Sequence, residues 1–205
     1  MNQFRQFSLT FDYRCPFARN LHEHVVTGVK AGANWDVDVL PFFLDQAQVE
    51  EGELSAWDNP KKRMNTMSLC LALLLKSEYP ESFWDLHLAI FNARHELGKN
   101  ISDPEVLAEV LVKGGIPGDY AQGLVLNAQS ANALETLRKT HGTLANDFLV
   151  FGNPTFIIGE SAVFLRMMER PQSDAAYSIQ LIEKILDTII LTPEINELKH
   201  TRLPR

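Results

Sequence analysis

The residues in this chain best placed to do chemistry are Cys15 and Pro16, at the point where an expected strand passes into an expected helix. Residues 6–13 alternate apolar and polar side chains, which is typical of a strand. From Pro16 to about residue 30 the apolar residues recur with helical spacing. A cysteine at a helix start lies among unpaired backbone N–H groups and at the positive end of the helix dipole. Both favour the thiolate, so the pattern predicts a nucleophilic sulfur.

The charged neighbours of this cysteine also favour its thiolate form. Arg14 and Arg19 flank Cys15, and each lowers the pKa of the thiol if it faces the sulfur. We therefore expect Cys15 to titrate below a free thiol, although a small buried residue without reactivity remains the alternative. Cys70, the second cysteine, lies in the apolar segment SLCLALLL, where a thiolate would be desolvated. We expect Cys70 to be a structural core residue and no disulfide between the two.

A second candidate segment is FGNPTFII, in which Asn153 and Pro154 directly precede a strand expected from Thr155. Proline removes a donor from the hydrogen-bond ladder and is therefore confined to strand starts and edges. Local physics favours a trans bond here, since only about 5–6% of X–Pro bonds in folded proteins are cis. A cis bond would instead form a tight turn that exposes the backbone of Asn153 to an extended ligand.

The histidines do not predict a metal site. His22 and His24 are two positions apart and lie on different helix faces, while His87 and His95 have no cysteine or acidic partner at ligand spacing. We interpret all four as surface or hydrogen-bonded residues. Arg166 is open to two interpretations, a contact to a ligand carboxylate or a solvated arginine at a strand end.

The opening segment has the order of a β-α-β unit. Residues 6–13 and 35–44 are the expected strands, and a helix over residues 16–30 joins them, which favours a parallel pair with a right-handed crossover. Residues 59–148 contain several helical patterns and no strand pattern. They predict an all-helical insertion.

Strand patterns return after the insertion. Residues 155–158 and 162–165 predict a hairpin around a Gly-Glu-Ser turn. Residues 175–191 predict a closing amphipathic helix. The polar residues 192–205 are expected to be a loosely held tail.

Composition excludes several classes of function. The chain has 205 residues, 45% of them hydrophobic and 22% charged, with a formal net charge of −7. Such an acidic chain is not expected to bind nucleic acid, and the longest apolar run, residues 69–75, is too short to span a bilayer. Residues 1–11 lack a signal pattern, and two cysteines do not make a disulfide framework. We therefore expect a protein of the cytoplasm.

The motifs DYRCPFA and GNPTFIIG, together with the element order, resemble the DsbA-like branch of the thioredoxin superfamily. FDYRCPFA is also similar to the D-x-x-S-P-x-A signature of 2-hydroxychromene-2-carboxylate isomerases and kappa-class glutathione transferases, which carry serine where this chain has Cys15. The resemblance implies an α/β, thioredoxin-like fold (β-α-β … β-β-α) with an all-helical insertion. On this basis the thioredoxin-like domain comprises residues 1–58 and 149–191, and the inserted helical domain residues 59–148.

The same resemblance implies a site. It implies that Pro154 is cis and packs across from Cys15, and that Asn153 binds the substrate backbone. The other residues expected to contact substrate or thiol are Arg14, Pro16, Phe17, Ala18, Arg19 and Thr155.

One residue departs from the pattern of the dithiol enzymes. Ala18 stands where these enzymes carry a second cysteine, so Cys15 cannot close an internal disulfide. The favoured interpretation is a monothiol oxidoreductase: Cys15 exchanges with a disulfide, and a small thiol resolves the mixed disulfide. We expect glutathione or mycothiol as co-substrate, a small-molecule or disulfide substrate, and no tightly bound cofactor.

Two alternatives to this oxidoreductase stay open. One is an isomerase or transferase that binds a thiol cofactor, with Cys15 stabilising or replacing the cofactor sulfur. The other is a binding protein that keeps the fold without turnover. A homodimer also stays open.

Overall fold

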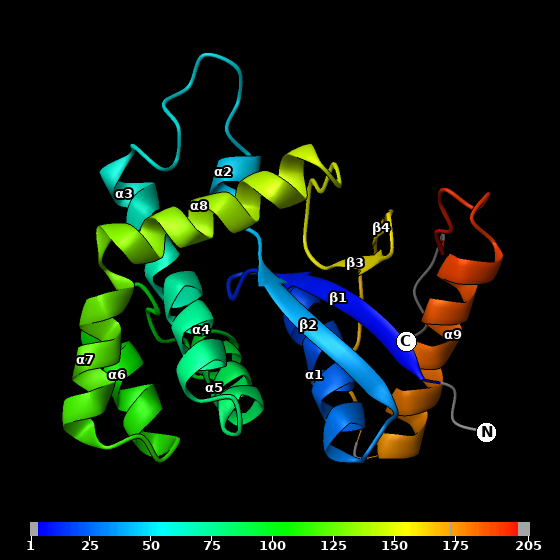
Figure 1. The fold of residues 1–205 in the computed structure, drawn as a ribbon, viewed down its shortest axis with the longest axis horizontal. Coiled ribbons are helices and arrows are strands. Elements are labelled where there is room, and N and C mark those ends of the chain that lie inside the picture. The colour runs from blue at the N-terminus through cyan, green and yellow to red at the C-terminus, as the bar shows by residue number, and fades with distance from the viewer. Residues whose placement is uncertain (1–3, 173, 201–205) are drawn as a thin grey trace.

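A mixed four-stranded sheet forms the centre of the molecule (Figure 1). The computed structural model describes residues 4–172 and 174–200. The strands are β1 (Arg5–Phe11), β2 (Trp35–Pro41), β3 (Thr155–Ile158) and β4 (Ser161–Phe164), in the order β2-β1-β3-β4. β1 and β2 are parallel, whereas β3 is antiparallel to both β1 and β4. The helix α1 (Pro16–Lys30) joins the parallel pair, so the predicted β-α-β unit and hairpin are confirmed.

Between β2 and β3 the regular elements are all helical, and over residues 59–148 this agrees with the predicted helical insertion. They are α2 (Leu44–Ala47), α3 (Pro60–Arg63), α4 (Met67–Glu78), α5 (Phe83–His95), α6 (Pro104–Lys113), α7 (Gly118–Ala128) and α8 (Ala131–Asn146), with a 3-10 turn at Met64–Thr66. Three of them begin at side-chain caps, because Asn59, Asp103 and Ser130 each accept a backbone N–H of the first turn.

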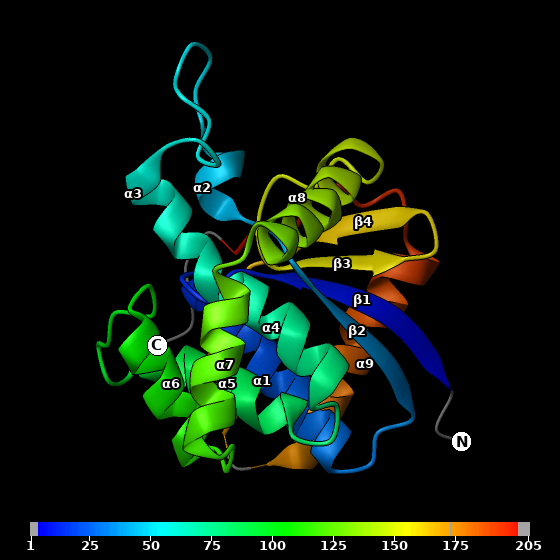
Figure 2. The same ribbon diagram turned by 60° about the vertical axis from the view of Figure 1, so that its left-hand side comes forward.

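Two layers cover the sheet. α1 and α9 (Ala175–Leu191) lie side by side on one face, where Phe7 and Leu9 of β1 are buried against them (Figure 2). α8 crosses the other face, with Leu144 packed near Ile157. A third buried cluster runs from Phe11 into the helical segment, so that segment shares its core with β1 and the start of α1.

The strand expected over residues 35–44 ends earlier, at Pro41. The N–H of Phe42 still donates to the carbonyl of Phe11 in β1 at 2.8 Å, but the two N–H groups after it bond outside the sheet. The backbone N–H of Phe43 donates to Nδ1 of His141, and that of Leu44 donates to Oδ2 of Asp12. The chain therefore turns into α2.

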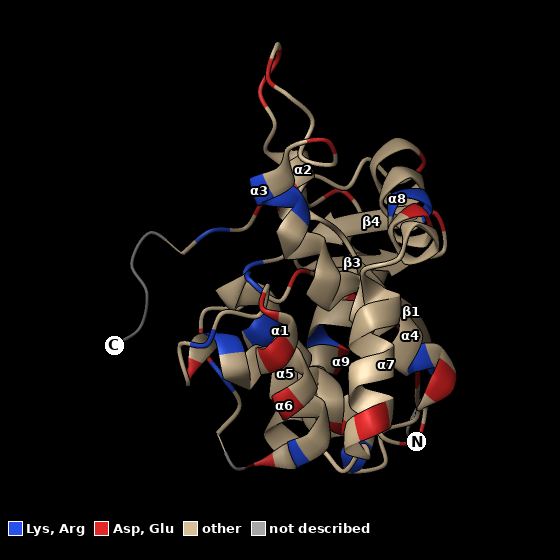
Figure 3. Ribbon diagram, turned by 90° about the vertical axis from the view of Figure 1, so that its left-hand side faces the viewer, with Lys and Arg blue, Asp and Glu red and all other residues tan. Residues whose placement is uncertain are grey.

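The molecular surface carries charges of both signs. Figure 3 shows Lys and Arg interspersed with Asp and Glu over the helices in view. None of the described helices has the length and apolar character needed to cross a bilayer. Residues 192–200 contain no helix or strand, and residues 201–205 of the expected tail lie outside the described part of the chain.

Gly28 of α1 lies against the Trp35 ring of β2. A Cβ atom at this position would lie 2.3 Å from the Trp35 ring, whose Nε1 donates to Glu183 at 2.6 Å. We predict that Gly28→Ala lowers the free energy of unfolding by about 1–3 kcal/mol, because overpacking outweighs the better helix propensity of alanine.

Urea unfolding followed by circular dichroism measures this effect. Gly123 in α7 supplies the matched control, since no atom outside the local backbone of its own helix lies within 4 Å of its Cβ position. Gly123→Ala is expected to raise the free energy of unfolding by about 0.5–1 kcal/mol. A Gly28→Ala protein as stable as Gly123→Ala would contradict the prediction.

Candidate functional site around Cys15

Cys15 caps the N-terminus of α1, as its sequence context predicts. It has an extended backbone, and Pro16 occupies the first helical position. The Cys15 N–H donates to the carbonyl oxygen of Asp12 at 2.9 Å, which closes a tight turn between β1 and α1. The backbone N–H groups of Phe17 and Ala18 point to the sulfur and favour its thiolate form.

The loop before β3 lies directly across from this sulfur. The Asn153–Pro154 peptide bond is cis, and the Cys15 thiol donates to the carbonyl oxygen of Asn153 at 3.3 Å. The loop is fixed on both sides. Nδ2 of Asn153 donates to the carbonyl of Phe42 at 2.8 Å, and the Thr155 N–H donates to Oγ1 of Thr10 at 2.9 Å.

Asp12 is a site residue whose role the sequence reasoning missed. Its carboxylate is 2% exposed and accepts the backbone N–H groups of Arg14 (2.9 Å) and Leu44 (3.1 Å). Burial raises the pKa of Asp12 to about 6, although these two N–H groups oppose the shift. The D-x-x-C spacing was the available signal, since it places a carboxylate at the end of β1 beside the cysteine turn.

The expected lowering of the Cys15 pKa is wrong for this site. Burial is the largest effect and raises the pKa of the thiol above its ordinary value, against the N–H groups of the first turn. Arg14 pairs with Asp45 at 2.6 Å and Arg19 pairs with Glu96 at 2.9 Å, so both charges are compensated.

The cation that does favour the Cys15 thiolate is Arg166, which the sequence left open. The predicted residues Cys15, Phe17 and Ala18 thus meet Asn153 and Pro154 in one place. The flanking residues Arg14 and Arg19 form their ion pairs with Asp45 and Glu96 around this place.

A buried hydrogen-bonded chain lies behind the Cys15 turn, and the sequence did not predict it. Nε2 of His22 lies 3.2 Å from the Thr10 carbonyl, which only accepts, so Nε2 carries the proton of a neutral ring. Nδ1 of His22 then accepts from Nε2 of His87 at 2.9 Å. Nδ1 of His87 in turn accepts from the Tyr13 hydroxyl at 2.8 Å. Burial lowers the pKa of His22 to about 4 and that of His87 well below its ordinary value.

The other two histidines considered in the sequence also have partners. Nε2 of His95 donates to the carbonyl of Tyr13 at 2.9 Å, and Nδ1 of His24 lies 3.0 Å from the Ser178 hydroxyl. Over residues 4–172 and 174–200, no three His, Cys, Asp or Glu side chains are grouped so as to hold a metal ion.

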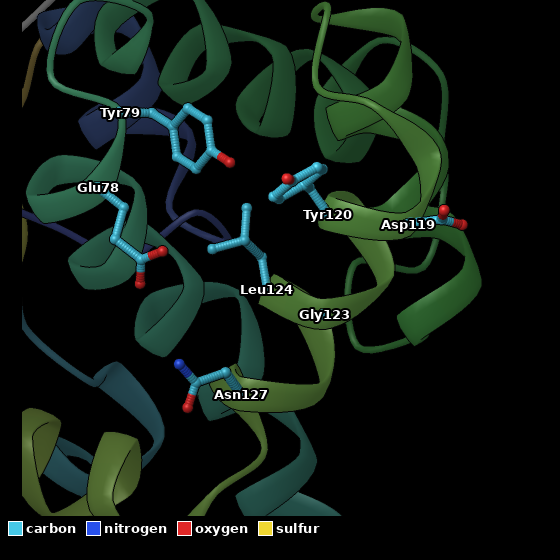
Figure 4. A pocket seen from close by; sticks show the side chains of 7 residues that line it. All are labelled: Glu78, Tyr79, Asp119, Tyr120, Gly123, Leu124 and Asn127. Carbon is cyan, nitrogen blue, oxygen red and sulfur yellow. The ribbon is translucent and has the colours of Figure 1, made fainter.

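Two surface hollows lie elsewhere on the molecule. The first, of about 280 Å³, lies between the end of α4 and α7, where the side chains of Tyr79, Tyr120 and Leu124 converge (Figure 4). The second, of about 300 Å³, lies on the sheet face next to Asp38. Neither contains Cys15, so the contacts of the sulfur, and not the size of a hollow, mark the chemical site.

A thioredoxin-like fold with a cysteine at the start of its first helix, facing a cis-proline loop, defines the class of this protein. The family model for the DSBA-like thioredoxin domain matches residues 8–171, and the chain belongs to this family. No curated protein sequence shows significant similarity to it.

Solved structures agree on the fold. Pseudomonas aeruginosa DsbA is similar at 18% identity and a TM-score of 0.57, with 92% of this chain and 83% of that chain covered. BdbD from Bacillus subtilis, in its oxidised form, is similar at 13% identity and a TM-score of 0.57, with 89% and 85% covered. A 2-hydroxychromene-2-carboxylate isomerase is similar at 13% identity and a TM-score of 0.60, with 92% and 98% covered.

The raised pKa of Cys15 predicts its pH profile. We expect the rate of alkylation by iodoacetamide to keep rising with pH beyond the point at which a free thiol levels off, because only the thiolate reacts. Cys70 is 1% exposed and burial raises its pKa to about 12, so Cys70 should react far more slowly.

Peptide mapping after timed alkylation at several pH values measures both rates. N-acetylcysteine amide in the same buffers gives the profile of a free thiol. A Cys15 profile that levels off at lower pH than this reference would restore the expectation of an acidic thiol.

Proposed function

We propose that this chain is a thiol–disulfide oxidoreductase that uses Cys15 as its only nucleophile. The observation that carries the proposal is the position of the sulfur. It lies at a helix start, where the N–H groups of Phe17 and Ala18 favour its thiolate form, and the thiol donates to the carbonyl of Asn153 at 3.3 Å. The residue one helical turn after Cys15 is alanine, so resolution has to come from another molecule.

The proposed reaction is two thiol–disulfide exchanges. The Cys15 thiolate attacks one sulfur of a disulfide, the S–S bond breaks, and the departing sulfur leaves as a thiolate. A small thiol, glutathione or mycothiol, then loses its proton and attacks the mixed disulfide. The Cys15 thiolate is released and a new disulfide forms, so that atoms and electrons balance over the cycle.

Two features support a small partner in a reducing compartment. Cys15 is only 6% exposed, which favours a slender disulfide over a bulky protein segment. The chain has only two cysteines, too few for the disulfide framework that is typical of small proteins in oxidising compartments. The proposal accordingly places the reaction in the cytoplasm, where thiols are kept reduced.

A second candidate function is an isomerase or transferase that binds a thiol cofactor. The observation in its favour is the raised pKa of Cys15, because a protonated thiol can donate a hydrogen bond to a cofactor thiolate. In this alternative Cys15 stays in the thiol form and forms no disulfide.

The two functions differ in a covalent product. If Cys15 exchanges, reduced protein incubated with glutathione disulfide or mycothiol disulfide gains one mixed disulfide on Cys15 and none on Cys70. Excess free thiol then removes the adduct. Mass spectrometry of intact protein and of peptides measures both steps, and Cys15→Ser is the control without the nucleophile.

Tight thiol binding without an adduct would replace the proposal with the second candidate. If neither an adduct nor binding of the small thiol is seen, the third alternative remains, a protein that keeps the fold to bind another molecule without turnover.

Ala18 provides a separate test of the missing resolving thiol. Ala18 is fully buried and its N–H points to the Cys15 sulfur, so a cysteine at this position would place a second thiol beside the first. We predict that Ala18→Cys raises the rate of oxidation of a reduced dithiol peptide on the order of tenfold above background. Ala18→Ser matches the substitution in size without the thiol and should stay at background. Equal rates in the two variants would show that another feature limits this chain.

A further inference from the structure

Arg166 differs from the other arginines of this region in its ion pairs. Arg14 pairs with Asp45, Arg19 with Glu96, and Arg170 with both Glu23 and Glu96. Arg166 is exposed and has no ion pair with any carboxylate in the described residues. Its positive charge is therefore available to a ligand.

Aromatic rings hold this guanidinium next to the Cys15 site. It lies 5.7 Å from the ring centroid of Phe17 and 5.6 Å from that of Phe164. Such cation–π contacts are electrostatically favourable and restrict the side chain. Phe17 belongs to the first turn of α1, two residues after the nucleophile.

The other ring connects Arg166 to the cis-proline loop. Phe164 pairs with Thr155 across the β3–β4 hairpin, and the N–H of Leu165 donates to the carbonyl of Pro154 at 3.1 Å. Arg166 follows Leu165 directly, so it lies beside the loop that faces the sulfur. Its charge also acts on the thiol, where it favours the thiolate.

We propose that Arg166 binds a carboxylate of the disulfide that Cys15 attacks, which makes carboxylate-bearing small disulfides the preferred substrate class. This inference rests on the proposed exchange reaction and leaves its chemistry unchanged. The guanidinium offers several N–H donors in a planar arrangement that matches a carboxylate. The formal net charge of −7 repels anions from the protein as a whole, so a preference for anionic substrates requires a local cation of this kind.

Three small disulfides of different charge test the inference. They are dithiodipropionate, which is anionic, hydroxyethyl disulfide, which is neutral, and cystamine, which is cationic. The rate of mixed-disulfide formation on Cys15 is measured by mass spectrometry at low ionic strength, and each rate is divided by that of N-acetylcysteine amide with the same reagent. This division removes the intrinsic reactivity of each disulfide.

Arg166→Gln removes the charge, and Arg166→Lys keeps it. Arg170→Gln is the matched control, because it removes an equal charge from the same segment at a residue that is already paired. In the wild type the anionic disulfide should react roughly fivefold faster than the neutral one after normalisation, the effect of one exposed charge pair at contact. Arg166→Gln should abolish this ratio, while Arg166→Lys and Arg170→Gln should retain most of it.

The ratio of the anionic to the neutral rate reports binding of the carboxylate and not the reactivity of the thiol. Any change in the acidity of Cys15 affects all three disulfides alike. A wild-type ratio near one, or a ratio that Arg166→Gln leaves unchanged, overturns the inference while exchange at Cys15 still stands. Failure of all three disulfides to modify Cys15 overturns the proposed exchange and the inference with it.

Discussion

The buried hydrogen-bonded chain from Tyr13 through His87 and His22 connects the parts of this molecule. Its members come from the turn between β1 and α1, from α5 and from α1, and it ends on the Thr10 carbonyl of β1. A buried polar group without a partner costs free energy. Moving any one of the three rings would therefore leave its neighbour without a hydrogen-bond partner. The Thr10 carbonyl can only accept, and this fixes the direction of all three hydrogen bonds. Through His87 of α5, the helical segment therefore packs behind the Cys15 turn.

The Cys15 turn is held by this buried chain and by the Asp12 carboxylate. Asp12 accepts two backbone N–H groups, one from the turn and one from the start of α2, and its own carbonyl accepts the Cys15 N–H. These bonds place the sulfur opposite Asn153. The same burial that makes the bonds effective raises the pKa of both Asp12 and Cys15. Precise placement of the sulfur is thus coupled to a less acidic thiol.

The sequence predicts the fold well because its signals are local. Alternating strands, the helix that begins at Pro16 and the Gly-Glu turn near residue 159 are each visible within a short window. Cys15 is identifiable for the same reason. The pairing of Tyr13 with His87 and the contacts of Arg166 join residues far apart in sequence, so no local pattern reports them. The ion pairs of Arg14 with Asp45 and of Arg19 with Glu96 are also invisible to a local pattern, because the partners lie far apart in sequence.

The pKa of Cys15 depends on groups at fixed positions and on how well the sulfur is covered. The helix N–H groups and Arg166 favour the thiolate at fixed positions, while desolvation opposes it only as long as the sulfur is covered. In the proposed exchange, a disulfide that reaches Cys15 displaces part of this cover, and water or polar groups of the ligand enter with it. The effect of desolvation then decreases, while the N–H groups and Arg166 keep their places. Under that proposal, access to the sulfur and its acidity rise together, so the thiol is least reactive when no ligand is near.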